Sequence, residues 1–294
     1  MESNHKNWYD KNYKIMLVLP ALLLLFSLIY LFNFYNHNGD VIHKDVSLTG
    51  GTTITVLDSN ADINKVKQDL ESKLPDLTIR AISDIRTGEQ KAFFIETTAD
   101  SEQARTALEE ILGYKLTNEN SSIEFSGSTL SSGFYQQLRF AVLLSFTLMA
   151  IVVFVIFRTP VPSAAVILAA FADIIMTVAV VDMMKIEVSV AGIVAFLMLI
   201  GYSVDTDILL TTRLLKKREG TVNQRLIGAF KTGMMMTLTA IASVGVSLII
   251  IYNISDTLRQ IFTIILIGLG FDILNTWITN ASMLKWYMEA KKIA

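Results

Sequence analysis

Six long apolar runs constrain the fold of this chain more than any other feature of its sequence. A helix needs ~20 mostly apolar residues to cross the hydrocarbon core of a bilayer. The runs that reach this length span residues 15–35, 138–157, 163–183, 189–211, 230–252 and 260–284. The composition agrees, because 52% of the 294 residues are hydrophobic, 18% are charged and the mean hydropathy is +0.48. Such values lie outside the range of soluble domains, so we predict a membrane protein with six transmembrane helices.

A polar stretch at residues 36–137 separates the first two apolar runs and carries a net negative charge. Alternating and helical periodicities predict strands at 51–57, 77–85, 91–98 and 122–126, and helices at 61–74 and just after Asp100. Asp100 is placed to cap the second helix, Gly113 to end it, and Thr87 and Gly88 to form the turn between the middle strands. The order βαββαβ predicts an α+β domain of the ferredoxin-like type.

The first apolar run is predicted to be a retained anchor. It is longer than the ~7 to 15 residues of a signal-peptide core, and the bulky residues Phe32, Phe34 and Tyr35 close it where a cleavage site would need small ones.

Lysine and arginine in the short connections predict the orientation of the helices. One side of the membrane receives nearly all of them, namely Lys6, Lys11, Lys14, Arg158, Arg213, Lys216, Lys217, Arg218, Arg225, Lys285, Lys291 and Lys292. The short connections on the other side hold Lys185 and Arg259. We therefore expect a cytoplasmic N-terminus (1–14) and tail (285–294), helix one at 15–35, an extracytoplasmic domain at 36–137, and helices two to six within 138–284.

The reactive residue types argue against several classes of enzyme. The chain has no cysteine, and its histidines, His5, His37 and His43, have no spacing typical of metal ligands. The acids of the polar domain are dispersed along predicted helix faces, as on a solvated surface. We expect no cofactor, no metal and no nucleic-acid partner, and a polar domain that binds or acts as a lever.

Five ionisable residues in the last four apolar runs are functional candidates, since each costs about 2.5–3.5 kcal/mol or more in the hydrocarbon core. Asp173 and Asp272 lie near the middle of the third and sixth helices, Asp205 and Asp207 lie toward the end of the fourth, and Lys231 opens the fifth. Asp205 and Asp207 point ~200° apart around a helix, so they cannot both face one partner. Lys231 is at the depth where it could pair with one of them, while Asp207 could instead extend toward the following basic loop.

Small and polar residues form stripes beside these acids. Gly268, Asp272, Asn275, Thr276 and Thr279 repeat every three or four residues, which predicts one face of the sixth helix turned into the bundle. Small residues on the fifth helix, such as Gly233 and Ala240, are typical of close helix packing.

Several motifs together resemble the SecF family of protein-export subunits. They are the run 200–207 (IGYSVDTD) followed by Arg213 and a basic loop, the run Thr49, Gly50, Gly51 and Thr52 that leads into the polar domain, Asp173, and Lys231 with Thr232. The resemblance covers essentially the whole chain and looks like the archaeal branch. Bacterial members carry an acid where this chain has Thr206, whereas here acids flank that position at Asp205 and Asp207.

The resemblance implies a function and partners. A SecF-like chain would pair with a homologous SecD-like subunit beside a SecY-type channel, and would use a proton or sodium gradient to promote export of a translocating polypeptide. On the basis of this resemblance, our hypothesis is that Asp205 is the leading residue of a proton or ion relay. It would be coupled to Asp173, Asp272 and Lys231, with Thr206 and Asp207 as auxiliary groups.

Two other functions remain alternatives. An ion-coupled exporter of small molecules or lipids, of the resistance-nodulation-division type, would also need intramembrane acids, but a single polar domain makes this chain half of such a pump. An intramembrane aspartyl protease would need a G-x-G-D signature, and Phe271 separates Gly270 from Asp272 here.

Overall fold

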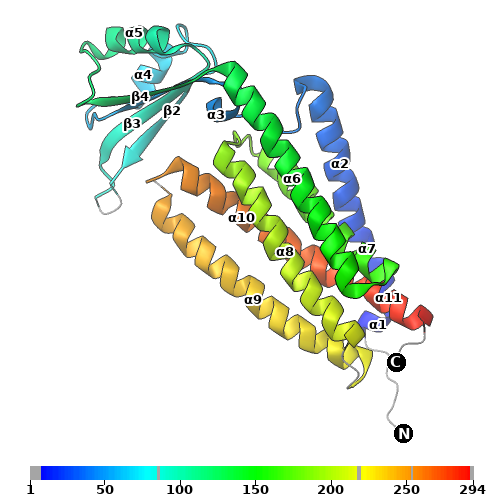
Figure 1. The fold of residues 1–294 in the computed structure, drawn as a ribbon. Coiled ribbons are helices and arrows are strands. Elements are labelled where there is room, and N and C mark those ends of the chain that lie inside the picture. The colour runs from blue at the N-terminus through cyan, green and yellow to red at the C-terminus, as the bar shows by residue number, and fades with distance from the viewer. Residues whose placement is uncertain (1–7, 85–86, 217–219, 253, 292–294) are drawn as a thin grey trace.

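The computed structural model describes residues 8–84, 87–216, 220–252 and 254–291, which form a helical bundle with a small α+β domain at one end (Figure 1). The long helices of the bundle are α2 (Val18–Asn38), α6 (Ser128–Phe157), α7 (Pro160–Met183), α8 (Val190–Lys216), α9 (Val222–Ile251) and α10 (Asp256–Leu274). The short helix α1 (Trp8–Met16) precedes α2, and α10 continues into the π-helical segment η1 (Asn275–Asn280) and helix α11 (Ala281–Lys291).

Within the described residues, six helical spans are long and apolar enough to cross a membrane, as predicted. The spans of α7, α8 and α10 bury many of their residues, whereas those of α2, α6 and α9 bury few. The first three therefore form the centre of the bundle, and the large apolar side chains exposed on the other three form its lipid-facing surface.

The α+β domain lies between α2 and α6 in the chain. Its elements are α3 (Val46–Thr49), β1 (Gly51–Val56), α4 (Ile63–Leu70), β2 (Thr78–Ser83), β3 (Gln90–Thr97), α5 (Ser101–Leu112) and β4 (Ser121–Ser126). The strands pair antiparallel in the order β2-β3-β1-β4, and α4 and α5 cover one face of the sheet (Figure 1). The predicted ferredoxin-like fold is confirmed.

Local sequence explains the helices of this domain. The side chain of Asp62 accepts hydrogen bonds from the first backbone N–H groups of α4, and that of Asp100 does the same for α5. Gly113 ends α5 with a φ of 76°. The core between helices and sheet consists of buried apolar side chains, among them Ile54, Val56, Leu70, Phe93, Ile95 and Leu108.

The chain enters and leaves the domain at one crowded point. Gly50 has a φ of 87°, and a Cβ there would lie 2.5 Å from the backbone of Ser128, where α6 begins. Gly51 has a φ of 146°, and its Cβ would meet the carbonyl oxygen of Thr97 at 2.2 Å. Thr52 is buried and its Oγ1 donates to the carbonyl of Ala99 at 2.8 Å. A side chain at Gly50 would therefore clash with the start of α6, and one at Gly51 would separate β1 from β3.

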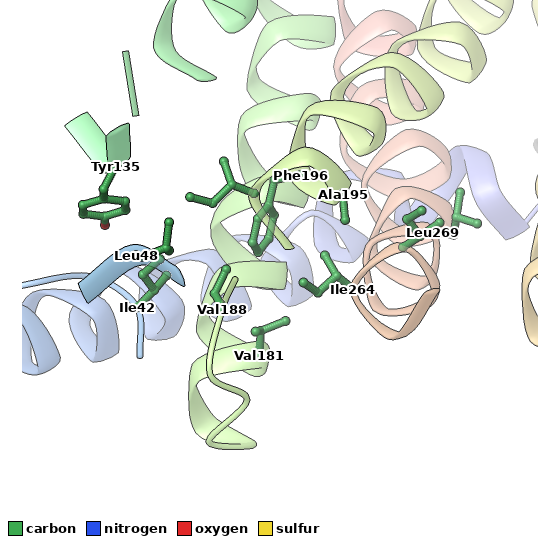
Figure 2. Close-up of a cluster of buried hydrophobic side chains, with 11 residues drawn as sticks. Ile42, Leu48, Tyr135, Val181, Val188, Ala195, Phe196, Ile264 and Leu269 are labelled. Carbon is green, nitrogen blue, oxygen red and sulfur yellow. The ribbon is translucent and has the colours of Figure 1, made fainter. Parts of the chain in front are cut away.

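A hydrophobic cluster joins the stem of the domain to the end of the bundle (Figure 2). Its labelled members are Ile42, Leu48, Tyr135, Val181, Val188, Ala195, Phe196, Ile264 and Leu269. Backbone hydrogen bonds support the same contact, because the N–H of Val188 donates to the carbonyl of His43 at 2.7 Å and that of Asp45 donates to the carbonyl of Val188 at 3.1 Å. The domain is thus attached to the bundle through packed contacts as well as through the chain.

Two helices, α6 and α9, begin well before their apolar runs. α6 starts at Ser128, ahead of the run at 138–157, because it continues past the apolar stretch up to the sheet. α9 starts at Val222, so Lys231 lies inside this helix and does not open it. Thr221 caps α9 through a reciprocal pair of hydrogen bonds with Gln224, a signal that precedes the apolar run.

Candidate functional site

Three carboxylates from three central helices lie in the interior of the bundle. Asp173 of α7, Asp207 of α8 and Asp272 of α10 are each no more than 1% exposed. The packing of α8 against both α7 and α10 brings these helices together. Polar side chains of α8 and η1 fill the space around the three acids, and this group is called the carboxylate cluster below.

Asp173 is held by donors from two other elements. Ser203 Oγ of α8 donates to its Oδ2 at 2.5 Å, and Asn275 Nδ2 of η1 donates to its Oδ1 at 2.7 Å. Thr279 Oγ1 in turn donates to Asn275 Oδ1 at 3.1 Å, which fixes the orientation of the amide. Each carboxylate oxygen of Asp173 therefore has a partner.

Asp272 is surrounded by hydroxyl groups. Thr206 Oγ1 lies 3.0 Å from its Oδ1 and 3.2 Å from its Oδ2, and Thr276 Oγ1 donates to Oδ1 at 3.0 Å. Thr206 also lies 2.9 Å from the carbonyl oxygen of Ser203. Because a hydroxyl has a single proton, Thr206 can donate to Asp272 or to its own helix backbone, and these contacts compete.

Asp207 has one satisfied oxygen and one without a partner. Asn280 Nδ2 of η1 donates to its Oδ1 at 2.7 Å, while Asp207 Oδ2 and Asn280 Oδ1 are buried without a hydrogen bond. Unpaired buried acceptors such as these are costly in a dry interior. A proton on Asp207 would remove its charge and make it a donor.

The π-helical turn gives these contacts their geometry. η1 supplies Asn275, Thr276, Thr279 and Asn280, all buried, to the acids on α7, α8 and α10. Single π-turns within α-helices often occur at functional sites. The wider turn lets Asn275 and Asn280 reach different carboxylates, on α7 and α8 respectively.

The carboxylate cluster has no cationic counterpart among the described residues, since the ion pairs of that part of the chain lie elsewhere. Three ionised carboxylates without cations would be very unfavourable in a low-dielectric interior. The composition of the cluster is therefore suited to the uptake of protons or a small cation.

Two of the predicted relay residues lie outside this cluster. Asp205 is exposed on the surface of α8, and Lys231 is exposed on α9. The spacing argument holds, since Asp205 and Asp207 face opposite directions, and Asp207 faces inward. The leading role assigned to Asp205 stays a prediction, and the structure brings together Asp173, Asp207, Asp272 and Thr206.

The other basic residues of this region bond to helix backbones near the ends of α8 and α9. Arg213 Nη1 donates to the carbonyl of Gly228 at 2.6 Å, and Arg225 Nη1 donates to that of Leu214 at 2.9 Å. These bonds fasten α8 to α9.

One polar donor of the cluster, Asn280, was not singled out from the sequence, whereas Asn275, Thr276 and Thr206 were. Asn280 lies beyond the predicted polar face of the last helix, because a regular α-helix does not account for the π-turn.

A second polar site, at the other end of α7, was also not predicted from the sequence. There Asp182 lies 2.6 Å from His43 Nδ1 and accepts a 2.9 Å hydrogen bond from the hydroxyl of Tyr30. No local motif indicates this site, because Asp182 is 152 residues from Tyr30 and 139 from His43 in the sequence.

Comparison with known proteins gives the family. Residues 107–290 match the family model for the C-terminal region of the protein-export membrane proteins SecD and SecF. The protein-export membrane protein SecF of Methanocaldococcus jannaschii is 37% identical, over 96% of this chain and 99% of its own length. The chain belongs to the SecF family. The SecF protein of Methanothermobacter thermautotrophicus, 38% identical over 96% of this chain and 94% of its own, agrees.

A solved structure shares the SecF fold described above. SecDF of Thermus thermophilus, a translocon-associated membrane protein, aligns with a TM-score of 0.73 and 18% sequence identity. The alignment covers 95% of this chain and 38% of that longer chain. Membership of the SecF family identifies the chain as a multi-pass membrane protein with a role in protein export.

Proposed function

We propose that this chain works with a SecD-like subunit, beside a SecY-type channel, to promote movement of a polypeptide across the cytoplasmic membrane with energy from a proton or sodium gradient. The observation that carries the proposal is the carboxylate cluster, in which Asp173, Asp207 and Asp272 are buried among polar side chains with no cation from the described part of the chain. Membership of the SecF family supplies the export role, and the cluster supplies a group that responds to ions.

The hydrogen bonds indicate how ion uptake would move the helices. Each carboxylate accepts hydrogen bonds from side chains of an element other than its own helix. The cluster therefore joins α7, α8 and η1. Protonation turns an acceptor into a donor and removes charge, which changes which of these bonds are favourable. The relative positions of α7, α8 and α10 would then depend on occupancy. The hydrophobic cluster shown in Figure 2 would pass that shift to the α+β domain.

The orientation of the chain is part of the proposal. Helix α1, the C-terminal end of α8 and the start of α9 lie at the end of the bundle opposite the α+β domain (Figure 1), and these segments carry Lys14, Arg213 and Arg225 respectively. Positive residues favour the cytoplasmic side, so the domain would be extracytoplasmic and both termini cytoplasmic.

The exposed face of α8 is the proposed contact with the SecD-like subunit. Val194, Met198, Gly201, Tyr202 and Asp205 recur at helical spacing and are all exposed. A carboxylate facing lipid at this depth costs about 2.5–3.5 kcal/mol or more, so Asp205 needs another protein surface that shields it from the lipid. Nothing lies within 4 Å of a Cβ built at Gly201, which leaves room for a second helix to approach closely. Asp205 and the exposed Lys231 would then act across the subunit interface.

The test is export in membrane vesicles that contain this chain, its SecD-like partner and the channel, driven by an imposed ion gradient. Asp272→Asn, which keeps the shape of the side chain but cannot be protonated in the same way, should lower gradient-driven export by roughly 5- to 150-fold. The matched control is Asp69→Asn on exposed α4, which should leave export unchanged. Asp272→Asn chains that assemble normally and export normally would remove the cluster from the mechanism.

A second measurement separates the roles of Asp205 and Asp272. Asp205→Asn and Gly201→Leu should reduce recovery of the SecD-like subunit in affinity purification from native membranes in mild detergent, whereas Asp272→Asn should not. Recovery of the wild-type chain as a homo-oligomer, with no second six-helix subunit, would contradict the proposed partnership and favour a self-assembled exporter.

A further inference from the structure

An apolar groove runs along the side of the bundle, apart from the carboxylate cluster. It has a volume of 870 Å³ and lies between α6, α7 and α8, below the chain that links α2 to the α+β domain. Its walls come from Phe140, Leu143 and Phe146 of α6, Phe171, Ile174 and Val178 of α7, and Phe196 of α8. Most of the surface inside the groove is apolar, and its size is within the range of small-molecule sites.

Two arginines fix the depth of this groove in the membrane. Arg139 and Arg158 bracket residues 140–157 of α6, a stretch without any charged side chain. At about 1.5 Å per residue this stretch spans roughly 27 Å, close to the thickness of the hydrocarbon core. Arg139 therefore lies at the level of the lipid headgroups, on the side of the α+β domain, and the groove descends from it into the acyl-chain region.

Arg139 is a cation without an anionic partner among the described residues. It is exposed at the mouth of the groove, with its guanidinium 5.6 Å from the centre of the Tyr135 ring. The nearby acid is already engaged, because Asp40 accepts from the hydroxyl of Tyr135 at 2.7 Å and pairs with Lys44 at 3.2 Å. The planar guanidinium remains free to bind a phosphate from outside, with two parallel hydrogen bonds.

We propose that this groove binds one phospholipid of net negative charge, with its phosphate on Arg139 and one acyl chain between Phe146, Phe171 and Phe196. The charge at the mouth and the apolar walls below it match the two ends of such a lipid. A helix of another subunit in the same place would need an acid at the level of Arg139. The proposal is independent of the export mechanism and uses the membrane location alone.

The groove is continuous with the junction below the domain. Tyr135, Ile42 and Phe196 line the groove and also belong to the hydrophobic cluster that holds the domain to the bundle (Figure 2). A bound acyl chain would therefore pack against that junction and stiffen it.

The experiment is photocrosslinking of the purified chain in phosphatidylcholine nanodiscs that contain a small fraction of phosphatidylglycerol with a diazirine in one acyl chain. Labelled peptides are mapped by mass spectrometry. Label should appear on α6 between Phe140 and Phe146 and on α7 between Phe171 and Val178, and unlabelled phosphatidylglycerol, but not phosphatidylcholine, should compete for it.

Two pairs of variants test the two halves of the site. Arg139→Ala should lower labelling of the groove about fivefold, whereas Lys216→Ala, the same change of charge at the opposite end of the bundle, should not. Val142→Trp should fill the groove and abolish its label, whereas Val155→Trp, on an exposed position of the same helix, should leave it. Thermal unfolding of each variant shows that it folds.

The proposal fails if the label spreads evenly over exposed parts of α2, α6 and α9, or if all four variants label alike. It also fails if label in the groove disappears once the SecD-like subunit is bound. In that case a Leu143→Cys variant of this chain, which has no cysteine of its own, would crosslink to the SecD-like subunit.

Discussion

Hydroxyl groups on α8 show how closely the interior of the bundle is specified. Thr206 and Thr211 are both buried on this helix. Thr206 lies within hydrogen-bond distance of Asp272, whereas the hydroxyl of Thr211 has no hydrogen-bond partner. The hydroxyl of Thr206 is therefore part of the polar network, whereas that of Thr211 is buried without a hydrogen bond and disfavours folding.

This difference predicts opposite effects of the same substitution. Thr206→Val removes a donor from Asp272 and should destabilise the chain by about 1–3 kcal/mol, since a buried acceptor loses its partner. Thr211→Val removes a hydroxyl that bonds to nothing and should be neutral or stabilising. Thermal unfolding in one detergent measures both. Equal losses of stability would show that Thr206 contributes packing and no hydrogen bond.

The spacing of Asp205 and Asp207 shows the limit of sequence reasoning for single side chains. The geometry of a helix predicts that only one of them faces a given neighbour, which the structure agrees with. It does not predict which one faces inward, because that depends on how α8 is rotated against α7 and α10. Likewise, the polar face around Asp272 was predicted from its repeat, but Asn280 was not.

The close contact between α8 and α10 is a property of the two helices together. A Cβ built at Gly268 would lie 2.4 Å from Leu199 Cδ2 and 2.9 Å from its Cγ, and Leu199 is fully buried. The absence of a side chain at Gly268 thus lets the helices approach beside Asp272. Gly270, two residues further along, has nothing within 4 Å of its Cβ position.

Gly268→Ala should therefore push the two helices apart and destabilise the chain by roughly 1–3 kcal/mol, the usual cost of overpacking. Gly270→Ala is the matched control and should be neutral or slightly stabilising, because alanine favours a helix. The midpoint of thermal unfolding compares the two variants.

The second residue of the contact makes this test sharper. Leu199→Ala leaves a cavity by itself, but in the double variant with Gly268→Ala the added methyl group occupies part of that space. The double variant should lose less stability than the sum of the two single variants. Strictly additive losses would indicate that Gly268 and Leu199 do not limit the approach of the helices.

The layout of the whole chain was largely predictable because two different solvents shaped it. Lipid requires long apolar runs, and water requires strands and helices with one polar face, so both the six spans and the βαββαβ order can be recognised. How the two parts meet could not be predicted. The face of the sheet without helices, with Arg80 and Glu96, lies over Glu187 and Asp256 at the end of the bundle, and contacts between segments so distant in sequence leave no periodic signal.

This junction between domain and bundle is rich in acids. Arg80 of β2 lies 3.8 Å from both Glu187, between α7 and α8, and Asp256, at the start of α10. Asp45 and Glu96 face the same cavity of 260 Å³. Four carboxylates thus surround one arginine, although Asp256 also pairs with Arg259. Burial, together with the nearby charge of Asp45, raises the pKa of Glu96 from 4.5 to about 7, although Arg80 opposes this shift.

The raised pKa of Glu96 predicts that the stability of the junction depends on pH. Because the folded-state pKa lies above the unfolded value of 4.5, the contribution of Glu96 is fully present below that value and is lost as the pH rises through about 7. Glu96→Gln stays neutral at every pH. It should therefore raise the thermal midpoint at pH 8, where Glu96 is ionised among three other acids, and change it much less at pH 5.

Glu124→Gln provides the control for this prediction. Glu124 lies on the same face of the sheet, paired through Thr53 with Glu96, but it is exposed on β4 and does not line the cavity. Its substitution should not alter the pH dependence of the midpoint. Equal responses of the two variants would mean that the sheet responds to its overall charge, and the junction would then not distinguish Glu96 from any other acid. A response confined to Glu96→Gln would make the attachment of the domain to the bundle sensitive to protons on the side of the membrane where the domain lies.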